Sequence, residues 1–451
     1  MSEASESPPP QSRPPAPVPG FNWGNAAEIV VAMLFVAAVL AVGVRFAGSE
    51  PERVAIGRAG PAPAVTAPRL PAVAAAAVPA PQQVTPGAPL PPNPSTIDIA
   101  FLDGRIRQLM NRKDMVGLGV VVVEDGAVRY LKGFGSTGGE GEPGSGAVTP
   151  NTVFRWASVS KGVAATMVAK LAEEGKLSLS DPVSRWSSSL KLPGDDQNVA
   201  TVTQLLSQRL GIVKNAYDDK LEDNEDPRAI RTMLGGLDRF CRPGQCWTYQ
   251  NVAYDAASEV VQKATGVDYG DAVRQSLFLP LGMKSASTTR EGLVSARSWA
   301  RPHIGQRTLE VKEAYYRVPA AGGVNSSIAD LGRWMQAQMG MRNDVLDEQL
   351  LWTIHLPRIE TARRSRAQAD VAMEDGRYAL GWRNHVYRGH RLVGHRGAVS
   401  GYRSLILFDP ALRTGIAMLW NSQSPKPPGL PLELFDMVYK LPRHDWMDLA
   451  G

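Results

Sequence analysis

The most informative segment of the chain reads TVFRWASVSKGVAATMVAKLAEEGKLSLSDPV (residues 152–183). Its apolar residues recur at helical spacing and end at Gly175, which predicts a helix over 160–174. Ser158 lies at the start of that helix, and Lys161, three positions later, falls on the same face. A neighbouring base turns a weak serine hydroxyl into a nucleophile, and free N–H groups at a helix start can stabilise an oxyanion. The alternative is an ordinary N-cap serine followed by a surface lysine.

Strand signals lie on both sides of this segment. The run GLGVVVVEDGAVRYLKGFG (117–135) has two β-rich stretches around Asp125-Gly126, the strongest short hairpin signal. The middle of the chain, about 200–350, is mostly helical in pattern. We therefore predict an α+β fold, in which one antiparallel sheet built from both ends of the domain is flanked by helices and carries a helical inserted subdomain. The other predicted elements are strands 390–394, 402–408 and 414–421 and helices 97–111 and 430–441.

A second short motif is Tyr249-Gln250-Asn251. A phenol near a lysine can relay the serine proton to a leaving group. The amide of Asn251 can orient the lysine and hold a substrate carbonyl. Taken alone, the tripeptide also fits a buried tyrosine followed by a turn asparagine.

The third motif is His395-Arg396-Gly397, at the end of a predicted strand. A glycine at this position lets a substrate lie close along the strand edge. The N–H group of Ala398 can then serve as a second oxyanion donor. His303-Ile304-Gly305 has the same pattern, but it lacks flanking strands, so we prefer His395.

The composition argues against several other kinds of site. Net charge is +5, and no long basic stripe interleaved with aromatic residues occurs, so no nucleic-acid partner is expected. We interpret the short cluster at Arg363, Arg364 and Arg366 as a solvated loop rather than a binding patch. The six histidines are scattered without metal-ligand spacing, and we expect neither a metal nor another cofactor.

The three motifs and their surroundings resemble the serine β-lactamase and penicillin-binding-protein superfamily. The resemblance is to its class C β-lactamase-like branch, which includes esterases, D-aminopeptidases and D-alanyl-D-alanine carboxypeptidase-like enzymes. It covers about 100–425, and the matching blocks keep their order and spacing. Besides 117–135 and 152–183, these blocks are LLSQRLGI (205–212), CRPGQCWTYQNVAY (241–254), AAGGVNSSIADLGRWM (320–335) and GHRGAVSGYRSLILFDP (394–410).

The resemblance implies a role for each candidate residue. Ser158 would be the acylated nucleophile, Lys161 its general base, and Tyr249 the group that protonates the leaving group. Asn251 would position the lysine and the substrate. His395, with Gly397, would line the substrate side, and the N–H groups of Ser158 and Ala398 would bind the oxyanion.

Two departures from the family pattern bear on the substrate. His395 stands where many β-lactamases have lysine, and Arg396 stands where a small residue is usual. A histidine with an ordinary pKa near ~6.5 supplies little fixed charge at pH 7, and alternation along a strand should keep Arg396 off the substrate face. We therefore expect esters or D-amino-acid amides to be preferred over penicillins and cephalosporins, and activity on anionic substrates to rise as pH falls. Gln208 and Arg209 also depart from the pattern, without an evident reason.

The competing function is a catalytically silent, membrane-tethered binding module on the same fold. Such a protein would be free to lose any of Ser158, Lys161 or Tyr249, and all three are present. The sequence therefore favours a serine hydrolase acting on a small-molecule or peptidoglycan-type ester or amide, with β-lactam hydrolysis as an alternative.

The N-terminal fifth of the chain has a different composition, with 19 of the 35 prolines in residues 1–95. We predict a disordered tail over 1–25, a single transmembrane helix over 26–48, an Ala/Pro-rich linker over 49–95 and the hydrolase domain over 96–451. A cleaved signal peptide and a buried core helix are the alternatives for the apolar segment.

The expected location is the bacterial inner membrane, with the domain in the periplasm, where the substrates of the family lie. Arg45, Arg53 and Arg58 follow the apolar segment and argue weakly for the opposite orientation. Cys241 and Cys246, the only cysteines, flank the turn pair Pro243-Gly244 and can form a disulfide; two reduced thiols are the alternative.

Overall fold

The computed structural model describes residues 95–139 and 141–450. The predicted tail over 1–25, the predicted membrane helix over 26–48 and all but the last residue of the predicted linker over 49–95 lie outside the described residues. Within the described part of the chain, no helix combines the length and the apolar character needed to cross a bilayer.

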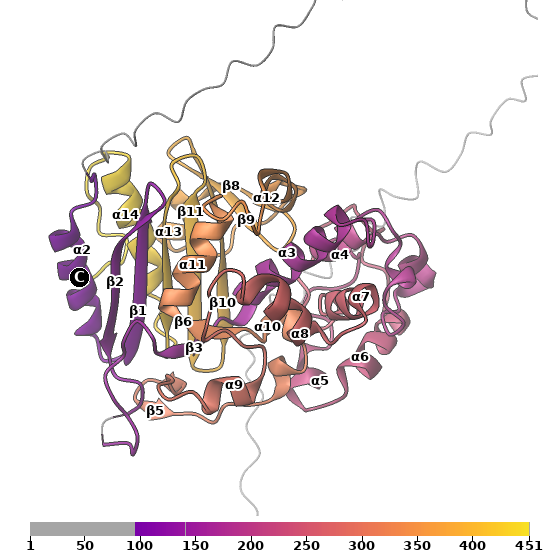
Figure 1. The fold of residues 1–451 in the computed structure, drawn as a ribbon, viewed down its shortest axis with the longest axis horizontal. Helices are drawn as coiled ribbons and strands as arrows, with labels where there is room; N and C mark the ends of the chain where they lie inside the picture. Colours follow the sequence, from indigo (N-terminus) through magenta and orange to yellow (C-terminus); the bar gives the residue numbers. More distant parts are fainter. Residues whose placement is uncertain (1–94, 140, 451) are drawn as a thin grey trace, which may run out of the picture. The chain divides into compact units, whose positions relative to one another are not determined.

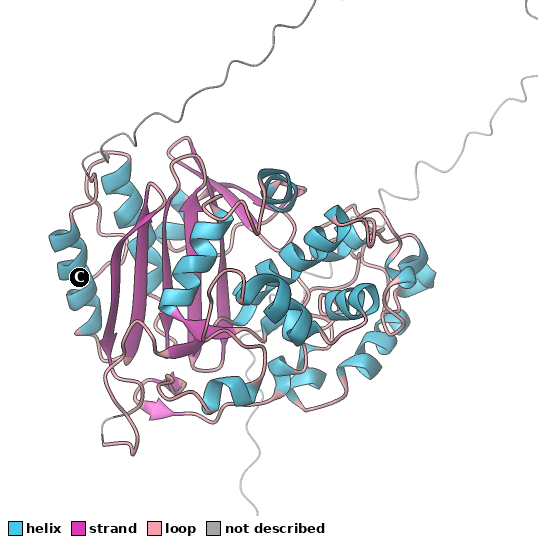
Figure 2. Ribbon diagram, in the orientation of Figure 1, coloured by secondary structure: helices cyan, strands magenta, loops and turns pink. Residues whose placement is uncertain are grey.

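An eight-stranded antiparallel sheet forms the centre of the domain (Figures 1 and 2). Strands from the two ends of the domain meet in its middle, where β1 pairs with β12. This arrangement confirms the predicted α+β class and the sheet built from both ends. The strands in spatial order are β2 (Ala127–Gly135), β1 (Gly117–Glu124), β12 (Thr414–Trp420), β11 (Tyr402–Asp409), β10 (His390–Val399), β9 (Arg383–Tyr387), β8 (Glu374–Tyr378) and β7 (Ile359–Glu360).

The predicted hairpin at Asp125-Gly126 is confirmed, with β1 and β2 joined by a two-residue turn. Both turn residues have positive φ, +47° and +78°, as the mirror-image hairpin turns require. Every residue of β1 is buried, because helices cover both faces of the sheet there.

Two apolar layers cover the two faces of the sheet. Alternate residues of each central strand point to opposite faces, so one strand contributes to both cores. On one face lie α2 (Ile99–Met110) and α14 (Leu430–Val438), packed on the side chains of Val120 and Met418. On the other lie α3 (Ser160–Glu173) and α11 (Ile328–Gln338), packed against Val121 and Ala417.

A mostly helical part of the chain lies beyond α3, as the pattern of residues 200–350 predicted (Figure 1). Helix α3 is buried on nearly every side, because it separates this part from the sheet. The helices of this part are α4 (Val202–Leu206), α5 (Asp218–Glu222), α6 (Pro227–Met233), α7 (Ala256–Thr265), α8 (Tyr269–Val273) and α10 (Pro319–Gly322). Helix α9 (Arg290–Val294) lies at the end of the sheet instead, where Leu293 packs with Val153 and Tyr402 (Figure 1).

One edge of the sheet differs from the prediction. Strands β7, β8 and β9 were not expected, because they are short and carry charged or half-exposed side chains instead of apolar alternation. Strand β10 is longer than expected. Its pairing with β9 ends at Gly394, whereas its pairing with β11 continues to Val399. Within the described residues, the second half of β10 therefore has one open edge, and this edge borders the candidate site.

Candidate active site

The segment that carries Ser158 is a tight turn between β3 (Val153–Arg155) and α3. Strand β3 pairs with β6 (Asn325–Ser327), which fixes the start of the turn. Ala157 then adopts φ +48°, a left-handed conformation that is costly for alanine. Strain of this kind persists only where the surrounding structure holds it, and here it precedes the half-buried Ser158.

Lys161 is completely buried and faces Ser158, one turn away. Its Nζ lies 3.5 Å from Ser158 Oγ, 2.7 Å from Asn251 Oδ1 and 3.0 Å from the carbonyl oxygen of Ala321. These acceptors hold the amine beside the hydroxyl group. The structure thus places the predicted base next to the predicted nucleophile.

Asn251 connects the lysine to an acidic residue that the sequence analysis did not single out. Its Oδ1 accepts from Lys161, and its Nδ2 donates to Asp218 Oδ2 at 2.7 Å. The second oxygen of Asp218 is buried without a hydrogen-bond partner in the described part of the chain. Burial raises the pKa of Asp218, while Asn251 and Lys161 oppose that shift. Asp218 therefore fixes which end of the Asn251 amide faces the lysine.

Tyr249 lies on the other side of the lysine amine. Lys161 Nζ is 4.7 Å from the centre of its ring, and the phenol lines one pocket of about 430 Å³ together with Ser158 and Asn251. The rings of Trp247 and Tyr378 pack around it, with centroids 6.2 and 6.5 Å away. All three predicted catalytic side chains therefore meet in one place.

Gln208 holds the motif at 249–251 in position, which explains a departure that had no account from sequence. Its side chain donates to the carbonyl oxygen of Gln250 at 3.0 Å and accepts from the N–H group of Gln250 at 2.8 Å. Gln208 itself has φ +63° and is buried. The Gln208 side chain thus makes the two hydrogen bonds with the Gln250 backbone that a neighbouring strand would otherwise make.

Gly397 brings β10 against the nucleophile turn. A Cβ atom at this position would lie 2.1 Å from the carbonyl oxygen of Trp156 and 2.2 Å from Ser404 Oγ. The hydroxyl of Ser404 also donates to the Trp156 carbonyl at 2.5 Å. The sequence predicted close approach of a substrate at this glycine, whereas the structure shows close approach of the nucleophile turn. This contact places Ala398 on the same pocket as Ser158.

His395 lines the pocket but is itself buried. Its Nδ1 lies 2.9 Å from the Arg396 carbonyl oxygen, which can only accept, so Nδ1 carries the proton. Its Nε2 then accepts from the hydroxyl of Tyr378 at 3.1 Å. Burial and the nearby charges of Arg383 and Lys161 hold the pKa of His395 well below its ordinary value of 6.5.

This lowered pKa argues against the pH response expected through His395. Because its folded pKa is depressed, the imidazole gains less positive charge than a free histidine as pH falls from 7.5 to 5.5. We expect the ratio of kcat/KM for an anionic ester to that for a matched neutral ester to stay constant between about pH 5.5 and 7.5. A ratio that rises severalfold toward acid would show that this histidine titrates there after all. The ratio is the useful quantity, because titration of groups that act on both substrates cancels in it.

Arginines supply the fixed charge that the histidine lacks. Arg363, Arg364, Arg383 and Arg396 all line the pocket that contains Ser158. Arg363, Arg364 and Arg366 are exposed residues of a loop, as predicted, and the first two also line this pocket, whereas Arg366 does not. The expectation that Arg396 stays off the substrate side is wrong, because β9 stops pairing at Gly394 and leaves room at the strand edge for a long side chain.

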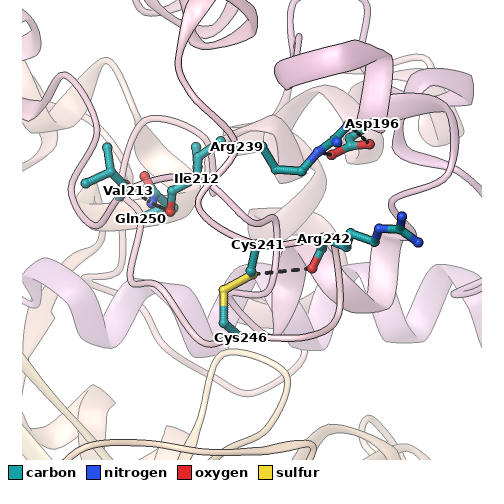
Figure 3. The surroundings of a disulfide bond; sticks show 8 residues. All are labelled: Asp196, Ile212, Val213, Arg239, Cys241, Arg242, Cys246 and Gln250. Atoms are coloured by element: carbon teal, nitrogen blue, oxygen red, sulfur yellow. Dashed lines mark hydrogen bonds and ion pairs between the residues drawn. A yellow bond between two sulfur atoms is a disulfide. The ribbon is translucent and has the colours of Figure 1, made fainter. Parts of the chain in front are cut away.

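A disulfide joins Cys241 to Cys246 just ahead of Tyr249 (Figure 3). Its Cα atoms lie 6.3 Å apart, and the bond closes a small loop on the segment that leads into the motif. On the chain-entropy argument, a loop this short gains about 2 kcal/mol from the bond. The same segment is tied down from the other side, where Gln250 Nε2 donates to the Val213 carbonyl oxygen at 2.6 Å.

The competing motifs lie elsewhere. The chain has a second serine and lysine three positions apart, Ser188 and Lys191, but both are outside any helix, and the neighbouring Ser189 bonds to the buried pair Arg231 and Glu259. His303 belongs to a two-residue strand and accepts or donates only to backbone and Thr308. Within residues 95–139 and 141–450, no group of three His, Cys, Asp or Glu side chains is arranged to hold a metal ion.

Comparisons with known proteins give a consistent result. A family model described as Beta-lactamase matches residues 102–436. The chain is 26% identical over 338 residues to the unguisins hydrolase ungD' of Aspergillus campestris, covering 70% of this chain and 60% of that protein. It is 25% identical over 335 residues to Protein flp of Staphylococcus aureus, covering 73% and 64%. The chain thus spans less than two thirds of the length of these relatives.

Solved structures show the same fold. The octameric penicillin-binding protein homologue from Pyrococcus abyssi superposes with a TM-score of 0.67 at 24% identity, over 76% of this chain and 78% of that one. A class C beta-lactamase mutant superposes with a TM-score of 0.62 at 20% identity, over 76% and 97%. At these identities the likeness concerns the fold alone.

Proposed function

Because the chain belongs to the Beta-lactamase family, we propose that this hydrolase-fold protein cleaves ester or amide bonds through an acyl-enzyme on Ser158. The main observation behind the proposal is the position of the Lys161 amine. The buried amine of Lys161 lies 3.5 Å from Ser158 Oγ and is held there by two acceptors. A base within reach of a serine hydroxyl is the arrangement that nucleophilic catalysis needs.

In the proposed reaction, Lys161 takes the proton of Ser158 as Oγ attacks the carbonyl carbon. The N–H groups of Ser158 and Ala398 donate to the oxyanion that forms. Tyr249 passes a proton to the leaving group, which departs as the acyl-serine ester forms. Water then attacks the ester and gives a proton to the Tyr249 phenolate, the bond to Oγ breaks, and Lys161 returns its proton to Ser158 Oγ.

The substrate class we propose is a small ester or a D-amino-acid amide or peptide, with β-lactam hydrolysis as the second candidate. The similarity to the unguisins hydrolase of Aspergillus campestris supports hydrolysis as the reaction. A catalytically silent module is disfavoured by the shared pocket of Ser158, Tyr249 and Asn251. No feature of the described residues other than the machinery itself would explain a completely buried lysine at this position.

The test is the intact mass of the protein after incubation with a serine-directed fluorophosphonate. We expect one adduct on the wild-type protein and none on Ser158→Ala. Ser160→Ala is the matched control, because Ser160 is buried and its hydroxyl accepts from the Val324 N–H group. This variant should still be labelled. An unlabelled wild-type protein, or equal labelling of Ser158→Ala, would contradict the proposal.

We further propose that the segment 26–48 anchors the protein in the bacterial inner membrane with the hydrolase domain in the periplasm. The support is the apolar run 29–44 and the Ala/Pro-rich composition after it. A reporter that is active only in the periplasm, fused to the C-terminus, tests the orientation. An inactive periplasmic reporter together with an active cytoplasmic one would reverse it.

A further inference from the structure

A buried carboxylate that the proposed reaction does not use lies one turn beyond Asn251 in the chain. Asp255, the residue before α7, is 2% exposed, and its backbone N–H group donates to the Asn251 carbonyl oxygen at 3.1 Å. The preceding residue, Tyr254, is buried and donates from its hydroxyl to the Lys161 carbonyl oxygen at 2.9 Å. The segment that follows Asn251 is therefore folded onto the first turn of α3, where the lysine lies.

The two oxygens of the Asp255 carboxylate have different partners. Oδ1 accepts from the N–H group of Ala320 at 2.9 Å, and Oδ2 accepts from Arg231 Nη1 at 3.0 Å and from Ser258 Oγ at 3.1 Å. Burial raises the pKa of Asp255 to about 6, although Arg231 and the N–H group of Ala320 oppose that shift. The carboxylate is therefore mainly ionised above neutral pH, and it links α6 to α10.

Helix α10 depends on an acceptor from outside. Its four residues, Pro319–Gly322, form a single turn, and the first N–H groups of a helix have no partner inside it. Its own cap residue makes no side-chain hydrogen bond to it, so Asp255 supplies the acceptor for Ala320. The next residue, Ala321, presents its carbonyl oxygen to Lys161 Nζ at 3.0 Å. A contact that fixes α10 therefore also fixes one of the acceptors of the catalytic amine.

Besides Ser158, the amine of Lys161 has two acceptors, Asn251 Oδ1 and the Ala321 carbonyl oxygen. Asp255 contacts the backbone at or next to each of them. We propose that Asp255 is a positioning residue of the site, which holds the two acceptors where they keep the amine beside Ser158 Oγ. Asp255 does not itself line the pocket of the nucleophile. The inference rests on the proposed function, because it concerns the base of the same reaction.

Glu259 offers a matched control, because it shares the same arginine. It is also buried, and its Oε1 accepts from Arg231 Nη2 at 2.9 Å. Its other partners in the described part of the chain are Arg228 and residues 187–189, none of which belongs to α10 or to the catalytic site. Removing either carboxylate therefore disturbs the same buried ion network, but only Asp255 is connected to the lysine.

The test compares Asp255→Ala with Glu259→Ala on a p-nitrophenyl ester. We expect both variants to unfold at a lower temperature than the wild-type protein, since each leaves Arg231 with one carboxylate fewer. Only Asp255→Ala should lose kcat, by about tenfold with KM within about twofold, because the lost hydrogen bond loosens the amine and not the substrate pocket. Asp255→Asn should recover most of kcat, since its amide oxygen can still accept from Ala320.

A second pair of variants keeps the test decisive if an unpaired buried arginine prevents folding. R231M/D255L and R231M/E259L replace the arginine together with one carboxylate by apolar side chains, a change that buried ion pairs often tolerate. The first variant should lose kcat by about tenfold, and the second should keep it within about threefold of the wild-type value.

Full kcat in a folded Asp255→Ala or R231M/D255L protein, or an equal loss of kcat in the matched Glu259 variants, would overturn the positioning role. Fluorophosphonate labelling of the wild-type protein separates this result from failure of the proposed function. If the wild-type protein is labelled on Ser158 and the Asp255 variants keep full kcat, the positioning role alone is wrong. If the wild-type protein is not labelled, both proposals are wrong.

Discussion

Replacing Lys161 by methionine is expected to lower kcat for a p-nitrophenyl ester by at least about 10³-fold. General bases contribute on the order of 10²–10⁴-fold by themselves, and removing one member of a catalytic unit costs far more than its separate share. The amine is also the only group that the structure places within hydrogen-bond reach of Ser158 Oγ among the described side chains. Methionine matches the length and volume of the lysine side chain, so the site keeps its packing.

The control for this change is Lys170→Met on the same helix. Lys170 lies in the last turn of α3, whereas Lys161 lies in the first, and its Nζ donates to the Val345 carbonyl oxygen at 3.2 Å. Its loss should therefore leave kcat within about twofold of the wild-type value. Thermal unfolding of both variants should follow a single cooperative transition. Activity of the Lys161 variant within tenfold of the wild-type protein would exclude the lysine as the base.

The parts of the fold that could be predicted from sequence are those with a strong local signal. The β1–β2 hairpin and the helix after Ser158 each rest on one dominant local signal, a two-residue turn and an apolar spacing closed by a glycine. Strands β7, β8 and β9 have no such signal. They form because β10 offers them an edge to pair with, and this is a tertiary cause that the sequences EDGRY and RNHVY do not reveal.

The site shows the same division. Ser158, Lys161, Tyr249 and Asn251 could be identified from motifs, because their chemistry is recognisable in short patterns. Asp218 could not, since it lies in the acidic run DDKLED, where a solvated helix face is the ordinary interpretation.

Charge was harder to predict than nucleophilic chemistry. His395 was expected to titrate normally, but its pKa depends on burial and on Arg383 and Lys161, which are distant in the sequence. The arginines at 363 and 364 lie in an exposed loop, as predicted, but nothing local shows that they also line the pocket of Ser158. The charge at a site depends on which chain segments lie close together in space, and a short sequence pattern does not show this.

The other large effect is expected at Gly397, where alanine should lower kcat/KM by about 10²-fold or more. The added Cβ would meet the Trp156 carbonyl oxygen at 2.1 Å, and this atom belongs to the backbone, so it cannot turn aside as a side chain does. Either β10 or the nucleophile turn must move, and a displacement of about 1 Å at the reacting atoms is enough for a loss of this size.

Gly146→Ala is the matched control, because a Cβ atom at Gly146 meets nothing within 4 Å. Its activity should equal that of the wild-type protein. Fluorophosphonate labelling gives a second measurement on Gly397→Ala, since a folded protein with a displaced oxyanion donor should be labelled much more slowly than the wild type. Labelling should be slow because Gly397 allows β10 to contact Trp156, and Ala398, the next residue, supplies the proposed oxyanion donor. If Gly397→Ala folds and retains full kcat/KM, the contact between β10 and the nucleophile turn does not position the oxyanion donors, and Ala398 loses its proposed role.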